Sequence, residues 1–184
     1  MRPNLPPARG SQLTLRAALA VVRAIKKTTG LAAKIKWPND VLVAGKKVCG
    51  ILSEMSSEPD AIHFVVLGVG INVNVSQTEF PAKIRETATS LSAQAHHPVS
   101  RIDLICRYLE EMETLYLSLR ENGFAPILEE IKKSCDSLGR LVEIHTTAQN
   151  VSGQAVDIDA DGALVLRREH GKTEKIYCGD LQVI

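Results

Sequence analysis

The sequence predicts an α+β protein in two parts, a mixed β-sheet with packing helices followed by a small β-barrel. Helical periodicity and strand-like alternation are interleaved up to residue 136. Beyond Leu138-Gly139 the apolar spacing changes from 3.6 residues to 2 and stays there. The 45% hydrophobic content of the 184 residues is enough for a packed core. We therefore expect one domain over residues 1–136 and a second over 137–184.

Three helices are expected in the first part. The first runs from a cap at Ser11 to about Thr29 and stops at Gly30. The second covers about 100–120 and the third about 126–135, where Pro126 suits a first helical turn. The spacing of the second predicts one apolar face made of Ile102, Ile105, Leu109, Met112, Leu115, Tyr116 and Leu119.

Strands are expected on either side of the second helix. Trp37-Pro38 imposes extended backbone before the proline. A hairpin follows, with strands at 41–43 and 46–52 joined by Ala44-Gly45, and a third strand covers 61–75. The barrel strands are expected at 141–146, 154–158, 163–168 and 175–177.

The third strand has two chemically different faces. Its odd positions are mostly apolar, whereas its even positions include Gly68, Gly70, Asn72 and Asn74. Glycine allows a ligand to approach the backbone, and an asparagine offers it both a donor and an acceptor. A flat ligand on this face is one interpretation, and a bulge or tight helix packing explains the glycines equally well.

The hairpin carries the charged candidates. Lys46 and Lys47 follow the turn, and one of them is expected to face inward, where an ammonium would stabilise a carboxylate and a phosphate together. A solvated lysine pair is the commoner outcome. Asn39 and Asp40 are either turn formers or ligands that position a phosphate or Mg²⁺. Trp37 is expected in the core or in a pocket wall.

Composition excludes several classes of function. A net charge of +1 provides no field that would gather nucleic acid, so no nucleic-acid partner is expected. The longest apolar run, 64–69, is too short to span a membrane, and the first residues lack the apolar region of a signal peptide. The four cysteines are scattered singly, which predicts buried free thiols and a cytoplasmic protein.

Several motifs together resemble one family. KWPNDVLVAGKKVCGIL at 36–52, LGVGINVNV at 67–75 and ATSL at 88–91 are similar, in order and spacing, to the catalytic domain of biotin protein ligases. The segment from LGRLVEIHT at 138–146 to the end resembles the small SH3-like C-terminal domain of that family. The resemblance covers nearly the whole chain and implies a class II synthetase-like catalytic fold.

The resemblance also implies residue roles. It selects Lys47 over Lys46, because the family lysine contacts both the biotin carboxylate and the ATP α-phosphate. It assigns biotin binding to Lys47, Gly50, Gly68 and Gly70, and ATP binding to Asn39, Lys47, Ile71 and Asn72. Asp40 is implied as a catalytic residue at the acceptor-lysine end and as a ligand of Mg²⁺.

The implied reaction is ATP-dependent biotinylation. Biotin and MgATP give biotinoyl-AMP, and a lysine of the biotin carboxyl carrier domain of a biotin-dependent carboxylase then attacks it. The small barrel and an exposed sheet edge both favour a homodimer.

A departure from the family leads to two competing interpretations. The family's glycine- and arginine-rich loop belongs upstream of Met1, so the resemblance implies a catalytic domain without its N-terminal part. A non-catalytic remnant that serves as an interaction module is therefore the first alternative. A lipoate or octanoate transferase is the second, and the SH3-like tail argues against it.

Overall fold

The computed structural model describes residues 6–58, 61–146, 149–169 and 171–184. Its first sheet holds four strands in the order β1-β2-β3-β4, and all neighbouring strands are antiparallel. These strands are β1 (Ala33–Lys36), β2 (Asp40–Val43), β3 (Lys46–Ser57) and β4 (Ile62–Ile71). The sequence analysis missed β1. The mixed sheet that we expected is, in the described residues, an antiparallel sheet built from hairpins, and parallel pairing is limited to two isolated bridges.

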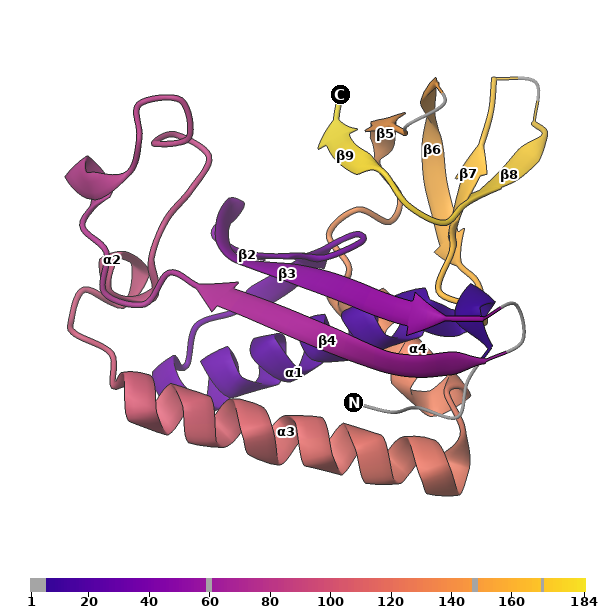
Figure 1. Cartoon of the computed structure of the whole chain (residues 1–184). Coiled ribbons are helices and arrows are strands. Elements are labelled where there is room, and N and C mark those ends of the chain that lie inside the picture. Colours follow the sequence, from indigo (N-terminus) through magenta and orange to yellow (C-terminus); the bar gives the residue numbers. More distant parts are fainter. Residues whose placement is uncertain (1–5, 59–60, 147–148, 170) are drawn as a thin grey trace.

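Helices cover one face of this sheet. Figure 1 shows α1 (Gly10–Thr29) and α3 (Arg101–Asn122) side by side beneath it, with α4 (Ala125–Ser134) next to them. Three short helices complete the part, namely η1 (Pro7–Arg9), η2 (Gln77–Glu79) and α2 (Leu91–Ala95). The core lies between the sheet and α1, which is buried on almost every side.

The C-terminal part is a sheet of five short antiparallel strands in the order β8-β7-β6-β5-β9. They are β5 (Leu141–His145), β6 (Asn150–Ile158), β7 (Leu164–Arg167), β8 (Thr173–Ile176) and β9 (Asp180–Val183). The α+β class with a small C-terminal β domain is confirmed. The sheet curves but does not close into a barrel, because in the described residues no pairing joins its edge strands β8 and β9.

The loop between β6 and β7 fastens the small domain to the first part. The backbone carbonyls of Ala160 and Asp161 accept hydrogen bonds of 2.7 Å from the side chains of Gln12 and Ser11 at the start of α1. The next carbonyl, that of Gly162, accepts one of 3.2 Å from the buried indole N–H of Trp37. Trp37 therefore joins the KWPND motif to the small domain.

The same contacts correct our expectation for Ser11. The helix α1 begins at Gly10, directly after η1, and Arg9 at its N-cap makes no capping hydrogen bond with its side chain. The Ser11 hydroxyl serves the domain junction instead. At the other end Gly30 closes the helix in the left-handed conformation, at φ 75°, as expected.

The helix α3 packs through only part of the predicted face. Leu115 is buried and Met112 and Leu119 pack against the core as expected, but Ile102, Ile105 and Leu109 are 75%, 57% and 59% exposed. Leu104 and the carboxylate residue Glu111, which lie outside the predicted face, are buried as well. The reason is electrostatic, because α1 presents cations that hold Glu111 in the interface and so fix the rotation of α3 about its axis.

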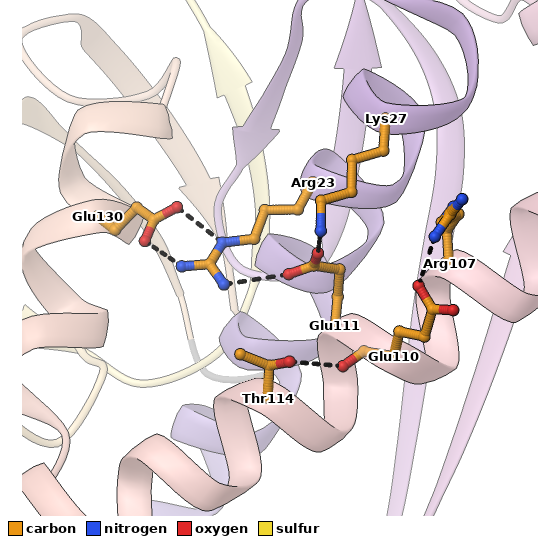
Figure 2. Close-up of polar contacts among 7 residues, drawn as sticks. All are labelled: Arg23, Lys27, Arg107, Glu110, Glu111, Thr114 and Glu130. Carbon is orange, nitrogen blue, oxygen red and sulfur yellow. Dashed lines mark hydrogen bonds and ion pairs between the residues drawn. The ribbon is translucent and has the colours of Figure 1, made fainter.

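Figure 2 shows this ion-pair network between three helices. The Arg23 guanidinium of α1 bonds both carboxylate oxygens of Glu130 on α4 and also reaches Glu111 on α3 at 3.1 Å, while Lys27 pairs with Glu111 from the next turn. Burial alone would raise the pKa of Glu111, but the hydrogen bonds from Lys27 and Arg23 outweigh it and lower that pKa. The hydrogen bond from Arg23 likewise lowers the pKa of Glu130.

Two further expectations can be compared with the fold. Among the helices of the described residues, none combines the length and the apolar character needed to cross a membrane. The four cysteines are free, but only Cys49 and Cys135 are buried, whereas Cys106 and Cys178 are exposed. The expectation that all four are buried is therefore wrong for two of them.

Candidate functional site

A β-bulge determines the direction of Lys47. The register between β2 and β3 shifts at this point, because Val41 pairs with Cys49 while its neighbour Leu42 pairs with Lys47. Val48 is the extra residue of the bulge, and both Val48 and Cys49 turn into the core. A regular strand would place Lys47 and Gly50 on opposite faces, whereas the bulge brings the Lys47 side chain over Gly50.

The Lys47 ammonium lies in a small charged group on the outer face of the sheet. Its Nζ is 2.6 Å from Oδ1 of Asp40 on the neighbouring strand, and the other carboxylate oxygen of Asp40 is 4.0 Å from Nζ of Lys36. A Cβ atom added at Gly50 would be 3.3 Å from the Lys47 Nζ. The ammonium therefore lies above the Gly50 backbone. The Lys47 side chain is 47% exposed, so a ligand can reach it.

The glycines of β4 extend this surface. Gly50 pairs with Gly70, and Leu52 pairs with Gly68, so the even residues of β4 share the outer face with Gly50 and Leu52. An added Cβ at Gly70 would meet only the Gly50 carbonyl oxygen, at 3.8 Å, and one at Gly68 would meet only Leu52, at 3.8 Å or more. Neither glycine is required by a close neighbour in the fold. The free space above them is consistent with a ligand on this face.

Asn39 and Asp40 have different structural partners. The Asn39 side chain donates a hydrogen bond of 2.8 Å from Nδ2 to the carbonyl oxygen of Ile51. In return, the Ile51 N–H donates one of 2.9 Å to the Asn39 carbonyl oxygen. This pair of bonds fixes the turn before β2, so that Asp40 enters the strand opposite Gly50. The structure brings Asp40, Lys47 and Gly50 together. Asn39 lies next to Asp40 in the chain, and its side chain stabilises the turn.

The end of β4 is built around Asn72. Its backbone N–H donates to the carbonyl of Val48 at 2.8 Å, and its side-chain Nδ2 donates to the carbonyl of Thr89 at 3.2 Å. Ile71, which we expected in the ATP site, pairs with Cys49 and is partly buried on the inner face. The side chains of Ile71 and Asn72 thus leave the strand on opposite faces.

The layer beneath the glycine-lined surface is uncharged at neutral pH. Burial, assisted by the charge of Asp40, raises the pKa of the Cys49 thiol to about 12. Burial, followed by the proximity of Cys49, raises the pKa of Tyr108 on α3 to about 12. Cys49 and Tyr108 are therefore neutral near pH 7, and Cys49 is a thiol there.

A cavity of about 690 Å³ opens beside this surface, between the start of α1, the strand β3 and the small domain. Its size lies within the range of sites for small molecules. It reaches Asn39 and Leu52, so it adjoins the charged group of Asp40 and Lys47. Its remaining walls include Gly10, Thr14, Met55, Tyr177 and Cys178.

The residues do not fit a magnesium site built from protein carboxylates. Asp40 is the predicted ligand, but one of its oxygens is occupied by the Lys47 ammonium and the other faces Lys36. In the described part of the chain, no three His, Cys, Asp or Glu side chains converge as metal ligands would. A cation at Asp40 would first have to displace Lys47.

Sequence reasoning missed three parts of the site. Lys36 was not predicted as a site residue, although its Nζ lies 4.0 Å from a carboxylate oxygen of Asp40. Ala88 and Thr89 entered only through the resemblance of ATSL at 88–91, and Thr87 was not predicted, yet the backbone of 87–89 pairs with that of Lys47. The small domain lines the adjacent cavity through Tyr177 and Cys178. The alternation around 46–50 fails to predict the bulge because nothing in a two-residue period marks an inserted residue.

Comparisons with known proteins identify the family. The model of the Biotin/lipoate A/B protein ligase family matches residues 1–72, and that of the Biotin protein ligase C terminal domain matches residues 137–183. The Bifunctional ligase/repressor BirA of Bacillus subtilis strain 168 is 38% identical over 183 residues, which are 100% of this chain and 56% of that protein. The chain thus spans a little over half of this relative.

Two further matches cover more of their own length. The Biotin--[acetyl-CoA-carboxylase] ligase of Paracoccus denitrificans is 31% identical over 94% of this chain and 73% of that protein. The biotin protein ligase from Aquifex aeolicus, solved in complex with biotin and ATP, has a TM-score of 0.81 at 27% identity over 98% of this chain and 75% of that one. The chain belongs to the biotin protein ligase family.

Proposed function

We propose that this chain forms the lysine-bearing wall of a site for ATP-dependent biotinylation of a lysine on a biotin carrier protein, by way of biotinoyl-AMP. The observation that carries the proposal is the position of the Lys47 ammonium above Gly50, beside the open surface of Gly68 and Gly70. A fixed cation next to side-chain-free backbone suits a ligand that is both flat and anionic. The names of the relatives support biotin and ATP as the two substrates.

In this proposal each residue has a defined task. The biotin carboxylate lies on Gly50, Gly68 and Gly70 and receives a charge-assisted hydrogen bond from Lys47. When the carboxylate attacks the α-phosphate of ATP, negative charge increases on the phosphate oxygens and pyrophosphate leaves. The same ammonium stabilises that charge, and an effect of this kind is typically worth 10²- to 10³-fold in rate. The acceptor amine then attacks the mixed anhydride and releases AMP.

Asp40 is proposed to act at the acceptor end. Its carboxylate holds the Lys47 ammonium when no ligand is bound and becomes available once biotinoyl-AMP engages that ammonium. It can then orient the incoming lysine of the carrier. Asn39 and Asn72 are proposed to contribute to the nucleotide side, whereas the Ile71 side chain packs on the inner face and is not proposed to contact ATP. Mg²⁺ is proposed to enter with the triphosphate of MgATP as substrate.

The partner and the location are also proposals. The acceptor is a biotin carboxyl carrier domain of a biotin-dependent carboxylase, in line with the printed name of the Paracoccus denitrificans relative. A cytoplasmic setting is supported by the four free cysteines. Exposed apolar side chains on the outer face, among them Leu52, Phe64 and Val66, support self-association as a homodimer.

Two measurements test the function. Isothermal titration of the chain with biotin and with ATP is expected to show binding of each. Lys47→Ala is expected to lower the rate of biotinoyl-AMP formation by about 100-fold or more, because a charge that acts in the transition state is removed. Lys46→Ala is the matched control and should remain near the parent rate. Binding of neither substrate, or equal effects of the two substitutions, would contradict the proposal.

A further inference from the structure

Lys47 is paired on one side by a segment outside the sheet. The last β3–β4 pair joins Cys49 to Ile71, after which β4 leaves β3. The Lys47 N–H then donates to the carbonyl of Thr87 at 2.8 Å, and the Lys47 carbonyl accepts from the N–H of Thr89 at 2.9 Å. Residues 87–90, here called the strap, thus take over the pairing at the residue that carries the predicted catalytic cation.

Two side-chain amides donate hydrogen bonds to the backbone carbonyls of the strap. Nδ2 of Asn72 donates to the carbonyl of Thr89, and Nε2 of Gln77 donates to the carbonyl of Ala88, each at 3.2 Å. The hydroxyl of Ser90 donates to the carbonyl of Val75 at 2.6 Å. Thr89 and Ser90 are only 1% and 0% exposed, so the strap is a packed element of the fold.

The strap bears on the direction of Lys47 because of the bulge. The extra residue Val48 interrupts the β2–β3 ladder directly after Lys47, although Lys47 itself still pairs with Leu42. Lysine also has a long, flexible side chain, so its ammonium stays in place only if its backbone is well fixed. The two hydrogen bonds from the strap fix the Lys47 backbone on the side away from β2, next to the residue where the ladder is interrupted.

We propose that the strap is the positioning element of Lys47 and that Asn72 serves the reaction as a positioning residue, by donating its amide to Thr89. The resemblance to the family implies only an ATP contact for Asn72. This inference rests on the proposed function for its catalytic consequence, whereas its structural part does not require activity.

Three substitutions distinguish the positioning of Lys47 from a contact between Asn72 and ATP. Asn72→Asp keeps the size and the acceptor oxygen that an ATP contact would use, but removes the donor to Thr89. Gln77→Glu removes the donor to Ala88, together with the bond of the same amide to the carbonyl of Arg85, at a residue outside the proposed substrate contacts. Asn74→Asp is the control, because among the described residues the hydrogen bonds of the Asn74 amide go to the backbone of Val99 and not to the strap.

The first experiment is amide hydrogen exchange of the 184-residue chain, followed by NMR. Exchange at the Lys47 and Thr89 N–H groups is expected to accelerate at least 10-fold in Asn72→Asp and Gln77→Glu and to stay unchanged in Asn74→Asp. The ¹³Cε shift of Lys47 should move in the same two variants, and that of Lys46 should not. Unchanged exchange at Lys47, or accelerated exchange without a change at its ¹³Cε, would overturn the proposal.

The second experiment measures biotinoyl-AMP formation. We expect Gln77→Glu to lower kcat by about 10-fold while the KM values for biotin and ATP stay within 2-fold, since positioning acts on the chemical step. A change in KM alone would overturn the positioning role. If the parent chain forms no biotinoyl-AMP, the proposed function fails, and exchange and the ¹³Cε shift still decide the role of the strap.

Discussion

Lys47 and Asp40 form an ion pair of 2.6 Å on the surface where an anionic substrate is proposed to bind. Asp40 is only 12% exposed at its side chain, whereas Lys47 is 47% exposed, so the carboxylate is the fixed partner and the ammonium the accessible one. A substrate carboxylate that approaches this ammonium meets the charge of Asp40 as well. The pair therefore determines both the attraction and the repulsion that an acid experiences here.

This geometry gives a prediction for Asp40→Asn. Biotin should bind a few-fold more tightly, because its carboxylate no longer faces a like charge, and the partial exposure of Lys47 limits the effect to roughly 1 kcal/mol or less. Isothermal titration with biotin measures it, and biotin methyl ester, which carries no charge, serves as the control ligand. Weaker binding of biotin by the variant would show instead that Asp40 is needed to hold Lys47 in position.

Gly70 and Gly50 give a second prediction. Without a ligand, the fold has room for a methyl group at Gly70 but not at Gly50. A methyl group at Gly70 would meet only a carbonyl oxygen at 3.8 Å, an ordinary contact, so Gly70→Ala should leave the free energy of unfolding within about 0.5 kcal/mol of the parent. The same methyl group occupies the proposed biotin surface and should weaken biotin binding by 10-fold or more. Urea unfolding and calorimetric titration of one sample measure the two effects.

Gly50→Ala is the comparison for this experiment. Its Cβ would lie 3.2 Å from Cε and 3.3 Å from Nζ of Lys47, so the lysine itself would have to move. Gly50→Ala should therefore disturb Lys47 even without ligand, which Gly70→Ala should not do. Normal biotin binding by Gly70→Ala would remove the reason for placing a ligand on β4.

The fold could be predicted where local signals coincide with packing. Gly30 ends α1 in the left-handed conformation as expected. The helix expected over about 100–120 begins after Ser100, whose hydroxyl accepts from the N–H of Asp103 at 3.2 Å. The predicted face of α3 was right for Leu115 and wrong for Ile102, Ile105 and Leu109, because the spacing of apolar residues does not show that Glu111 is buried against cations of another helix. The rotation of α3 about its axis depends on ion pairs with α1, which is distant in the sequence.

The site could be predicted only in part for a similar reason. Lys47 and Asp40 were each candidates from the sequence, but their approach and the sharing of one face with Gly50 depend on the bulge at Val48. The residues themselves left Lys46 and Lys47 equivalent, and the resemblance to the family separated them. In the structure only Lys47 reaches Asp40 among the two. The strap and the small-domain wall depend on contacts between distant segments, which no local pattern records.

Two arginines on α1 provide a third prediction. The three guanidinium nitrogens of Arg16 are buried and have no hydrogen-bond partner within the described residues, although Arg23, two turns later, pairs with two carboxylates. Burial lowers the pKa of Arg16, which reflects the cost of its charge there. Arg16→Met should raise the free energy of unfolding by about 1–4 kcal/mol.

Arg23→Met is the matched control on the same helix. It removes the bidentate pair with Glu130 and leaves the buried Glu111 with Lys27 alone, so it should lower the free energy of unfolding by about 1–3 kcal/mol. Chemical unfolding of the two variants at pH 7 compares them directly. Destabilisation of similar size in both would mean that Arg16 has an acceptor that the described residues do not include.

The pH dependence of stability follows from the network in Figure 2. The pKa of Glu111 in the folded chain lies below its ordinary value of 4.5, as does that of Glu130, so the unfolded chain binds protons more readily than the folded one. The stability from these carboxylates is therefore complete above about pH 4.5 and is lost as the pH falls through their folded pKa values. Urea unfolding between pH 6 and pH 3 should show a progressive loss.

Glu111→Gln identifies the share of this loss that belongs to the network. The variant should be less stable than the parent at pH 7 by about 1–3 kcal/mol, since Arg23 and Lys27 lose a buried acceptor charge. Its stability should then change less than that of the parent between pH 5 and pH 3, because one titrating group is absent. Glu110→Gln, on the exposed side of the same helix, should change neither quantity by more than about 0.5 kcal/mol. Parallel pH profiles for Glu111→Gln and the parent would show that other carboxylates govern acid unfolding and that the helix interface does not depend on this charge.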